Sequence, residues 1–162
     1  MDFEQMFERL VGHEKGYSNR NPEDDPGGET NWGISKRSYP LLDIKNLTRD
    51  QAAAIYFTDF WQPLTRKGPP HPAVLWQAFD FAVNAGMQTS IRKLQSAIGV
   101  ADDGHWGPIS AARLAAMEVG DVVMLFNAEQ LDYRRKLSNW AANASGWTAR
   151  VAQNLRYGAA DT

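Results

Sequence analysis

Apolar residues recur with the spacing of an α-helix along most of the chain. Near the N-terminus they follow the i, i+3, i+4, i+7, i+8 rule of a helix that buries one face. The members of this first stripe are Phe3, Met6, Phe7, Leu10 and Val11. Gly16 stands where such a helix would end, because glycine suits the turn that terminates a helix. The pattern therefore predicts an amphipathic helix at the start of the chain.

Similar stripes continue toward the C-terminus. Thr48 and Gln51 have the spacing of a capping box, which predicts a helix from there through Phe57. Further helices are indicated over residues 75–83, 91–98, 108–117, 122–140 and 147–155. Residues 63–72 hold four prolines and one glycine, so we expect a connector between two helical parts. The pattern predicts a mainly α fold without internal repeats.

One segment interrupts the helical pattern. Residues 17–31 contain Asn, Asp, Pro and Gly and almost no apolar side chain. Such a composition is typical of a loop or of a small hairpin closed by turn residues. We therefore expect a short irregular or hairpin region at about residues 17–34 within an otherwise helical protein.

Composition narrows the classes of function. The chain has 162 residues, 43% hydrophobic and 22% charged, as in one ordinary globular domain. It has no cysteine, which excludes a disulfide scaffold and a zinc site made of thiolates. A net charge of −2 argues against a nucleic-acid partner, including a helix-turn-helix DNA binder. The three histidines are scattered, so we expect no metal and no cofactor.

The sequence shows neither a signal peptide nor a membrane-spanning stretch, which bears on where the protein is located. The N-terminal residues lack the basic start and the apolar run of a signal peptide. No stretch approaches the ~20 apolar residues that cross a bilayer. We therefore expect synthesis in the cytoplasm, export only through another component, and no stable membrane insertion.

Glu14 extends the first apolar stripe. It lies eleven residues after Phe3, and three helical turns cover about eleven residues. Apolar neighbours and the negative end of the helix dipole both disfavour a charged carboxylate, which raises its pKa. A carboxyl that stays protonated near neutral pH is what a general acid requires. The alternative is a frayed helix end with Glu14 in water.

The polar segment supplies four more carboxylates, namely Glu23, Asp24, Asp25 and Glu29. A calcium loop is one interpretation, but the sixth position is Asp24 instead of glycine and the twelfth is Thr30 instead of a bidentate glutamate. The other interpretation pairs one of these carboxylates with Glu14. Glycoside hydrolysis needs such a pair, one group to protonate the leaving oxygen and one to activate water or attack directly.

Two motifs in this region resemble glycoside hydrolase family 108. Residues 14–17 read Glu-Lys-Gly-Tyr, against Glu-Gly-Gly-Tyr in the family, and residues 25–34 read Asp-Pro-Gly-Gly-Glu-Thr-Asn-Trp-Gly-Ile, which matches Asp-Pro-Gly-Gly-x-Thr-x-x-Gly-Ile at every fixed position. Lys15 is the one departure. The family consists of N-acetylmuramidases, which are lysozymes found largely as phage endolysins and in related bacterial proteins. The resemblance implies a lysozyme-like helical fold and bacterial peptidoglycan as the partner.

The second half also resembles the family. Its predicted peptidoglycan-binding region is matched at residues 79–86, at Asp103-Gly104, at residues 106–108 and around Trp147 and Arg150. The first half alone would be marginally stable because it has few stripes to pack. We therefore expect a single lysozyme-like catalytic domain over residues 1–162, with the catalytic motifs in residues 1–65 and a helical lobe in residues 73–162.

The resemblance assigns roles to particular residues. Glu14 is the general acid, and Asp25 is the second carboxylate, chosen over Asp24 because it precedes Pro-Gly-Gly. Thr30 is expected to hydrogen-bond a catalytic water. The residues expected to bind substrate are Tyr17, Glu29, Asn31, Trp32, Asp80 and Asn84. Of these, Asp80 and Asn84 follow Trp76 at i+4 and i+8, in a row beside the apolar stripe of their helix.

Two other functions are compatible with the same motifs. A lytic transglycosylase also uses one essential glutamate, and a peptidoglycan-binding protein without activity would tolerate Lys15. Whether the anomeric configuration is retained or inverted depends on the distance between the two carboxyl groups. The resemblance to endolysins further implies a monomer that waits in the host cytoplasm and reaches the cell wall through a holin-type lesion.

Overall fold

The computed structural model describes residues 1–13, 16–19 and 28–162. Within these residues the protein is mainly helical, with one small antiparallel sheet. Contacts group the chain into two compact units, Met1–Asp59 and Phe60–Thr162. None of the helices in the part of the chain that the structure describes is both long enough and apolar enough to cross a membrane.

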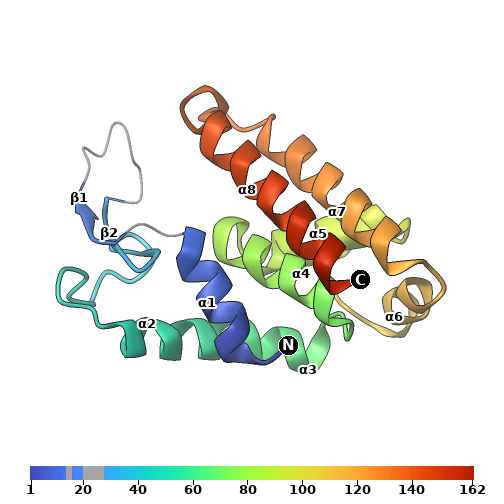
Figure 1. Ribbon diagram of the computed structural model, residues 1–162, viewed down its shortest axis with the longest axis horizontal. Coiled ribbons are helices and arrows are strands. Elements are labelled where there is room, and N and C mark those ends of the chain that lie inside the picture. Colours follow the sequence, from blue (N-terminus) through green and yellow to red (C-terminus); the bar gives the residue numbers. More distant parts are fainter. Residues whose placement is uncertain (14–15, 20–27) are drawn as a thin grey trace. The chain divides into compact units, whose positions relative to one another are not determined.

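The first unit contains helix α1 (Phe3–His13), helix α2 (Arg49–Tyr56) and the sheet. The predicted stripe of α1 is confirmed, because Met6, Phe7 and Leu10 are fully buried. Phe3 and Phe7 contact the aromatic rings of Phe57 and Tyr56, respectively. These ring contacts place α1 beside the C-terminal end of α2 (Figure 1).

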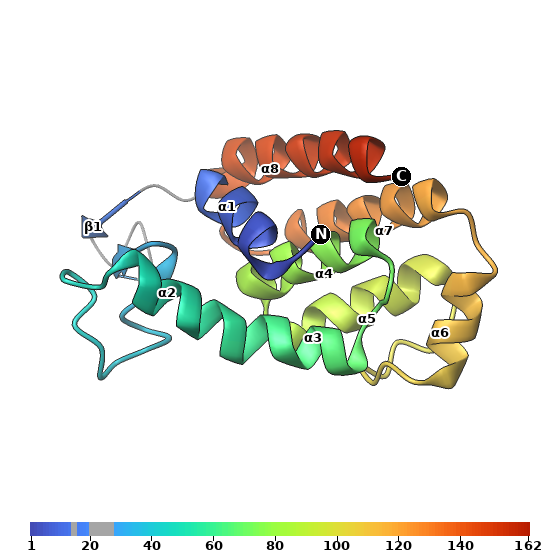
Figure 2. The same cartoon turned by 60° about the horizontal axis from the view of Figure 1, so that its bottom comes forward.

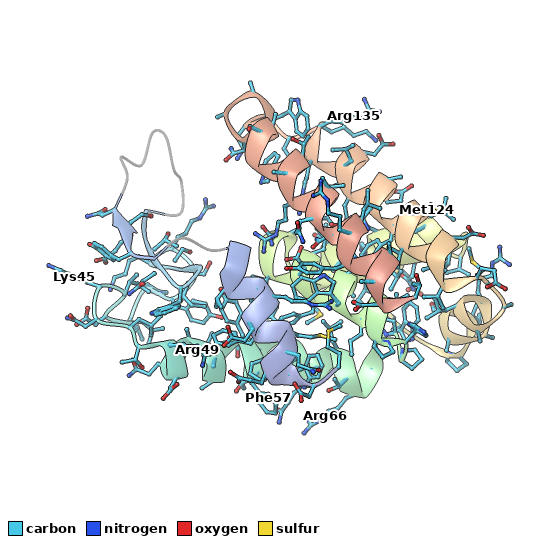
Figure 3. The ribbon with its side chains drawn as sticks, viewed as in Figure 1. Lys45, Arg49, Phe57, Arg66, Met124 and Arg135 are labelled. Atoms are coloured by element: carbon cyan, nitrogen blue, oxygen red, sulfur yellow. The ribbon has the colours of Figure 1, made fainter. Side chains whose placement is uncertain are left out.

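Arg49 ties the two helices of this unit together. Its guanidinium forms ion pairs with Glu4 and Glu8, one turn apart on α1, and lies 4.9 Å from the ring centroid of Phe7. Figure 3 shows Arg49 on α2 next to α1. The capping box that precedes Arg49 is confirmed, since the Thr48 side chain accepts from the Gln51 backbone N–H and the Gln51 side chain accepts from the Thr48 backbone N–H.

The polar region forms a sheet with strand order β1-β2-β3. The strands are β1 (Ser18–Asn19), β2 (Glu29–Asn31) and β3 (Ile34–Ser35), all antiparallel. Strands β2 and β3 are joined by Trp32 and Gly33, both at positive φ (53° and 78°). Positive φ at both central residues is the requirement of a type I′ turn, which matches the twist of a hairpin. In the residues that the structure describes, the expected irregular or hairpin region thus forms a three-stranded sheet.

A π-helical segment η1 (Phe57–Trp61) follows α2, and the boundary between the two units falls within it. Helix α3 (Gln62–Lys67) comes next, with Pro63 in its first turn. The predicted connector over residues 63–72 is therefore wrong in its first half. Pro63 lacks the N–H group of a helix-interior residue, and it stands just after η1, where the helical hydrogen-bond pattern already changes.

The second unit is built around helix α4 (Pro72–Ala85), which contacts α3, α5 (Met87–Ile98), α7 (Val119–Arg134) and α8 (Trp140–Asp161). Helix α6 (Pro108–Ala115) packs on α5. Helices α7 and α8 lie side by side (Figure 1, Figure 2). At Gly158 a Cβ atom would overlap the Val123 side chain, so this approach of α8 to α7 requires glycine.

The long helix predicted over residues 122–140 ends early, because α7 ends at Arg134, and Trp140 instead begins α8, which includes the helix predicted over residues 147–155. Residues 135–139 contain neither proline nor glycine, so the sequence carries no strong signal of the break. Arg134 is itself buried, and it lies 5.3 Å from the ring centroid of Phe81. Burial lowers the Arg134 pKa to about 10, while the charge of Asp80 acts in the opposite direction.

Candidate functional site

The predicted site residues of the first unit gather on its small sheet. Tyr17 directly precedes β1, Glu29, Thr30 and Asn31 form β2, and Trp32 begins the turn to β3. Glu14 and Asp25, the two predicted catalytic carboxylates, lie outside the described residues, and their roles stay predictions. The sheet carries the described part of the site.

Asn31 anchors the sheet to the interior of the unit. Its Nδ2 donates to the backbone carbonyls of Ile44, Lys45 and Leu47 at 3.1, 3.3 and 3.3 Å. The residue is 7% exposed. A buried amide that serves three carbonyls positions its strand, so the structure gives Asn31 a positioning role. Its predicted contact with substrate stays a prediction.

Trp32 is held in its uncommon backbone conformation from two sides. Its Nε1 donates to the Leu47 carbonyl at 3.1 Å, and its own carbonyl accepts from the Tyr56 hydroxyl at 2.9 Å. A non-glycine residue at positive φ costs about 1–3 kcal/mol and persists only where the surroundings enforce it. The indole is half-buried, so part of the residue stays accessible for the predicted contact with a ligand.

Tyr17 and Glu29 are brought together. The Tyr17 hydroxyl donates to Glu29 Oε1 at 3.0 Å, and the tyrosine is 43% exposed. This hydrogen bond to the carboxylate is the main cause that raises the Tyr17 pKa above its ordinary value. Tyr17 therefore stays protonated at neutral pH, and the pair presents a phenol and a carboxylate at an accessible edge of the sheet.

Thr30 occupies the centre of the sheet. It pairs with Ser18 on one side and with Ser35 on the other. Its hydroxyl donates to the Gly28 carbonyl at 3.1 Å, and the residue is half-buried. Because that donor is already used, the Thr30 oxygen is left to accept a hydrogen bond from a water or a ligand.

Asp80 is fully buried in the second unit and has no accessible surface for a ligand. Its carboxylate accepts from Arg150 Nη2 at 2.8 Å, from Arg150 Nε at 3.0 and 3.2 Å, and from Asn154 Nδ2 at 2.6 Å. Trp76, the first residue of the predicted row beside the apolar stripe, is also fully buried. The structure assigns Asp80 a structural role, because α4 is enclosed by helices on several sides.

Asn84, the other residue predicted on α4, is half-buried. Its Nδ2 donates to the backbone carbonyl of Asp80 at 2.8 Å, a bond within its own helix. This bond leaves the side-chain oxygen as an acceptor. The predicted contact of Asn84 with an N-acetyl group stays a prediction.

Sequence reasoning missed the partners of Asp80. Arg150 and Asn154 lie on α8, 70 and 74 residues further along the chain, and no local pattern connects residues so far apart. Buried amides continue this contact, because Gln77 Nε2 donates to the Asn154 carbonyl and Asn127 Nδ2 donates to Gln77 Oε1. Polar contacts thus fix the mutual positions of α4, α7 and α8.

The described residues do not form a metal site. Over residues 1–13, 16–19 and 28–162, no group of three or more His, Cys, Asp or Glu side chains is placed to hold a metal ion. The accessible groups of the sheet and its turn are hydroxyls, the Glu29 carboxylate, the Asn19 amide and the Trp32 indole. These groups suit hydrogen bonding and stacking with a polar, ring-containing ligand.

A helical protein with a small antiparallel sheet that carries these polar groups has the architecture of lysozyme-like glycoside hydrolases. Residues 7–86, which contain both motifs and the sheet, match the family model glycosyl hydrolase 108. The resemblance inferred from the sequence is confirmed, and the chain belongs to this family.

A solved structure supports the same conclusion. The chain is similar to the structure of Brucella abortus SagA, with a TM-score of 0.86 and 26% sequence identity. The match covers 98% of this chain and 94% of the other. The predicted mainly α, lysozyme-like fold is therefore confirmed. None of the curated proteins compared with the chain matches it.

Proposed function

We propose that this protein is an N-acetylmuramidase that cleaves the β-1,4 bond between N-acetylmuramic acid and N-acetylglucosamine in peptidoglycan. The observation that carries the proposal is the family match over residues 7–86, which spans Glu14, Asp25 and the whole sheet. The accessible polar groups of the sheet support it, because a saccharide offers many hydroxyl and amide groups to such a surface.

In the proposed reaction Glu14 donates its proton to the glycosidic oxygen, and the bond from that oxygen to the anomeric carbon breaks. The transition state resembles an oxocarbenium ion, whose positive charge the Asp25 carboxylate stabilises. A water molecule supplies the new oxygen at the anomeric carbon, and its proton passes to a carboxylate. Asp25 acts as the base for this water, or it stabilises charge only.

The residues of the sheet take supporting roles in this proposal. The Thr30 oxygen, left as an acceptor by its bond to Gly28, orients the attacking water. Tyr17 and Glu29, joined at 3.0 Å, bind sugar hydroxyls at the edge of the sheet, because Glu29 shares its face with Asn31 and not with Thr30. The Trp32 indole stacks on a pyranose ring. Asn31 holds β2 in place for all of these contacts.

The decisive experiment is digestion of purified peptidoglycan by wild-type protein and by Glu14→Gln, with the products identified by mass spectrometry. We expect wild type to release fragments with reducing N-acetylmuramic acid ends. Glu14→Gln should lose nearly all activity with its fold retained, because an amide cannot deliver the proton. Glu8→Gln is the matched control, since Glu8 lies on α1 in an exposed ion pair with Arg49 and should leave cleavage unchanged.

Each alternative has its own signature in this experiment. Anhydromuramic ends as the main product would identify a lytic transglycosylase. Binding to peptidoglycan without any cleavage by wild type would identify a binding protein. Substantial activity of Glu14→Gln would remove Glu14 from the role of general acid.

We further propose that the protein is a monomeric phage endolysin, a role supported by the resemblance of its motifs to endolysins. Expression in the cytoplasm of a Gram-negative host should then leave cells intact until a holin or a permeabilising agent opens the inner membrane. Lysis without such an opening would contradict storage in the cytoplasm. Size-exclusion chromatography with light scattering tests the monomer.

A further inference from the structure

The register of the sheet aligns three hydroxyl side chains. Ser18 on β1 is the direct partner of Thr30 on β2, and Thr30 is the direct partner of Ser35 on β3. Directly paired residues of antiparallel strands project from the same face of the sheet. With neighbouring strands about 4.8 Å apart, the row Ser18–Thr30–Ser35 extends over roughly 10 Å across the strands.

The next pair in the register shows which face is covered by the first unit. Asn31 and Ile34 are direct partners, and they are 7% and 2% exposed. Side chains alternate between the two faces along a strand, so Thr30 and Ser35 lie on the face opposite to this buried pair. All three hydroxyl residues are half-buried, which leaves part of each accessible.

Two of the hydroxyls are oriented by the protein itself. The Thr30 hydroxyl donates to the Gly28 carbonyl. The Ser35 hydroxyl donates to Ser38 Oγ at 3.0 Å and accepts from the Ser38 backbone N–H at 3.2 Å. A hydroxyl has one donor and two acceptor positions, so Thr30 and Ser35 keep acceptor positions and have their donors committed. Thr30 and Ser35 are therefore set to receive hydrogen bonds.

We propose that Ser18 and Ser35 are substrate-positioning residues, which act with Thr30 as one row of acceptors for the O–H and acetamido N–H groups of the amino-sugar chain. This inference rests on the proposed function and adds to it. The motif of the family includes Thr30 only, whereas the row is defined by strand register. Ser18 and Ser35 lie one strand away on either side, so they contact sugar units beside the one where the water attacks.

The test compares Ser35→Val with Ser35→Thr, and Ser18→Val with Ser18→Thr. Valine and threonine have nearly the same shape and similar preference for strands, and they differ in the hydroxyl. One lost hydrogen bond corresponds to roughly a 2- to 12-fold effect on binding. We expect each valine variant to raise the KM for soluble peptidoglycan fragments by that factor with kcat little changed. The threonine variants should match wild type.

The double variant Ser18→Val/Ser35→Val should raise KM by about the product of the two single effects, because the two residues are separated by the width of the sheet. Unchanged melting temperatures would exclude a loss of fold as the cause. Equal KM values for the valine and threonine partners would overturn the inference, and so would a fall in kcat alone. Cleavage by wild type is measured in the same assay, so failure of the proposed function would be seen separately.

Discussion

The buried carboxylate of Asp80 allows the sharpest test of how the second unit is held together. Its side chain has no exposed surface, and Arg150 and Asn154 both donate to it. In Asp80→Asn the negative charge is lost. One carboxylate oxygen becomes an NH2 group, which cannot accept the hydrogen bonds that Arg150 and Asn154 donate. Arg150, whose side chain is 11% exposed, would then keep its positive charge without this carboxylate.

The size of the effect follows from this geometry. Removing one partner of a buried ion pair costs about 3–5 kcal/mol, because the other charge stays desolvated. Domains have a total stability of about 5–15 kcal/mol, so this is a large fraction of it. At roughly 2–4 °C per kcal/mol for a chain of this length, the melting temperature should fall by roughly 6–20 °C.

Urea unfolding followed by circular dichroism measures the loss, with Asp132→Asn as the matched control. Asp132 makes the same kind of ion pair with Arg135, but in an exposed position on α7, where side-chain exposures are 55% and 57%. Figure 3 labels Arg135 near the end of that helix. An exposed pair contributes about 0–1 kcal/mol, so Asp132→Asn should be nearly neutral.

A double-mutant cycle with Arg150→Gln separates the pair from its surroundings. If the contact is what matters, the second substitution should cost little once the first is made, and the coupling should be large. Equal stabilities of Asp80→Asn and Asp132→Asn would refute the reasoning, since burial would then add nothing to the value of the carboxylate.

Two further predictions concern the sheet and a loop of the second unit. Asn31→Ala removes a donor shared by three carbonyls, and it should lower the free energy of unfolding by about 1–3 kcal/mol, measured by fluorescence-monitored unfolding. The control Asn19→Ala, at an exposed position, should cost almost nothing. Equal losses in the two variants would contradict an anchoring role for Asn31. Asp103 has a pKa below its ordinary value, chiefly because the His105 backbone N–H and the Gln95 amide donate to it. The charged Asp103 carboxylate therefore stabilises the fold at neutral pH, and this stabilisation is lost as the pH falls through the lowered pKa. The amide chemical shift of His105 should follow this titration. The same titration of the His105 shift in Asp103→Asn would contradict the assignment.

Local signals along the chain predicted those parts of the fold that depend on neighbours in sequence. The stripe Met6, Phe7 and Leu10 predicted the buried face of α1, and Thr48 with Gln51 predicted the start of α2. Helical period and end caps involve residues three or four positions apart, so they can be read without knowing the fold. The same reasoning failed at residues 135–139, where α7 ends without a proline or glycine in the sequence.

The candidate site shows the same division. Its motifs, around Glu14 and from Asp25 to Ile34, are local and identified the family from the sequence. The roles of individual side chains were less predictable, because Asn31 proved to be an anchor and Asp80 a buried ionic partner. A side chain with hydrogen-bonding groups has the same sequence signature whether it faces a ligand or the protein interior.

The helical class, the family and the segment that holds the predicted catalytic groups could be predicted without a structure, since each follows from local spacing of residue types. The row of Ser18, Thr30 and Ser35, and the contact of Arg150 with Asp80 across 70 residues, are visible only in the folded protein. Strand register and helix packing are set by the total burial and pairing of many distant groups. No window along the chain contains that information.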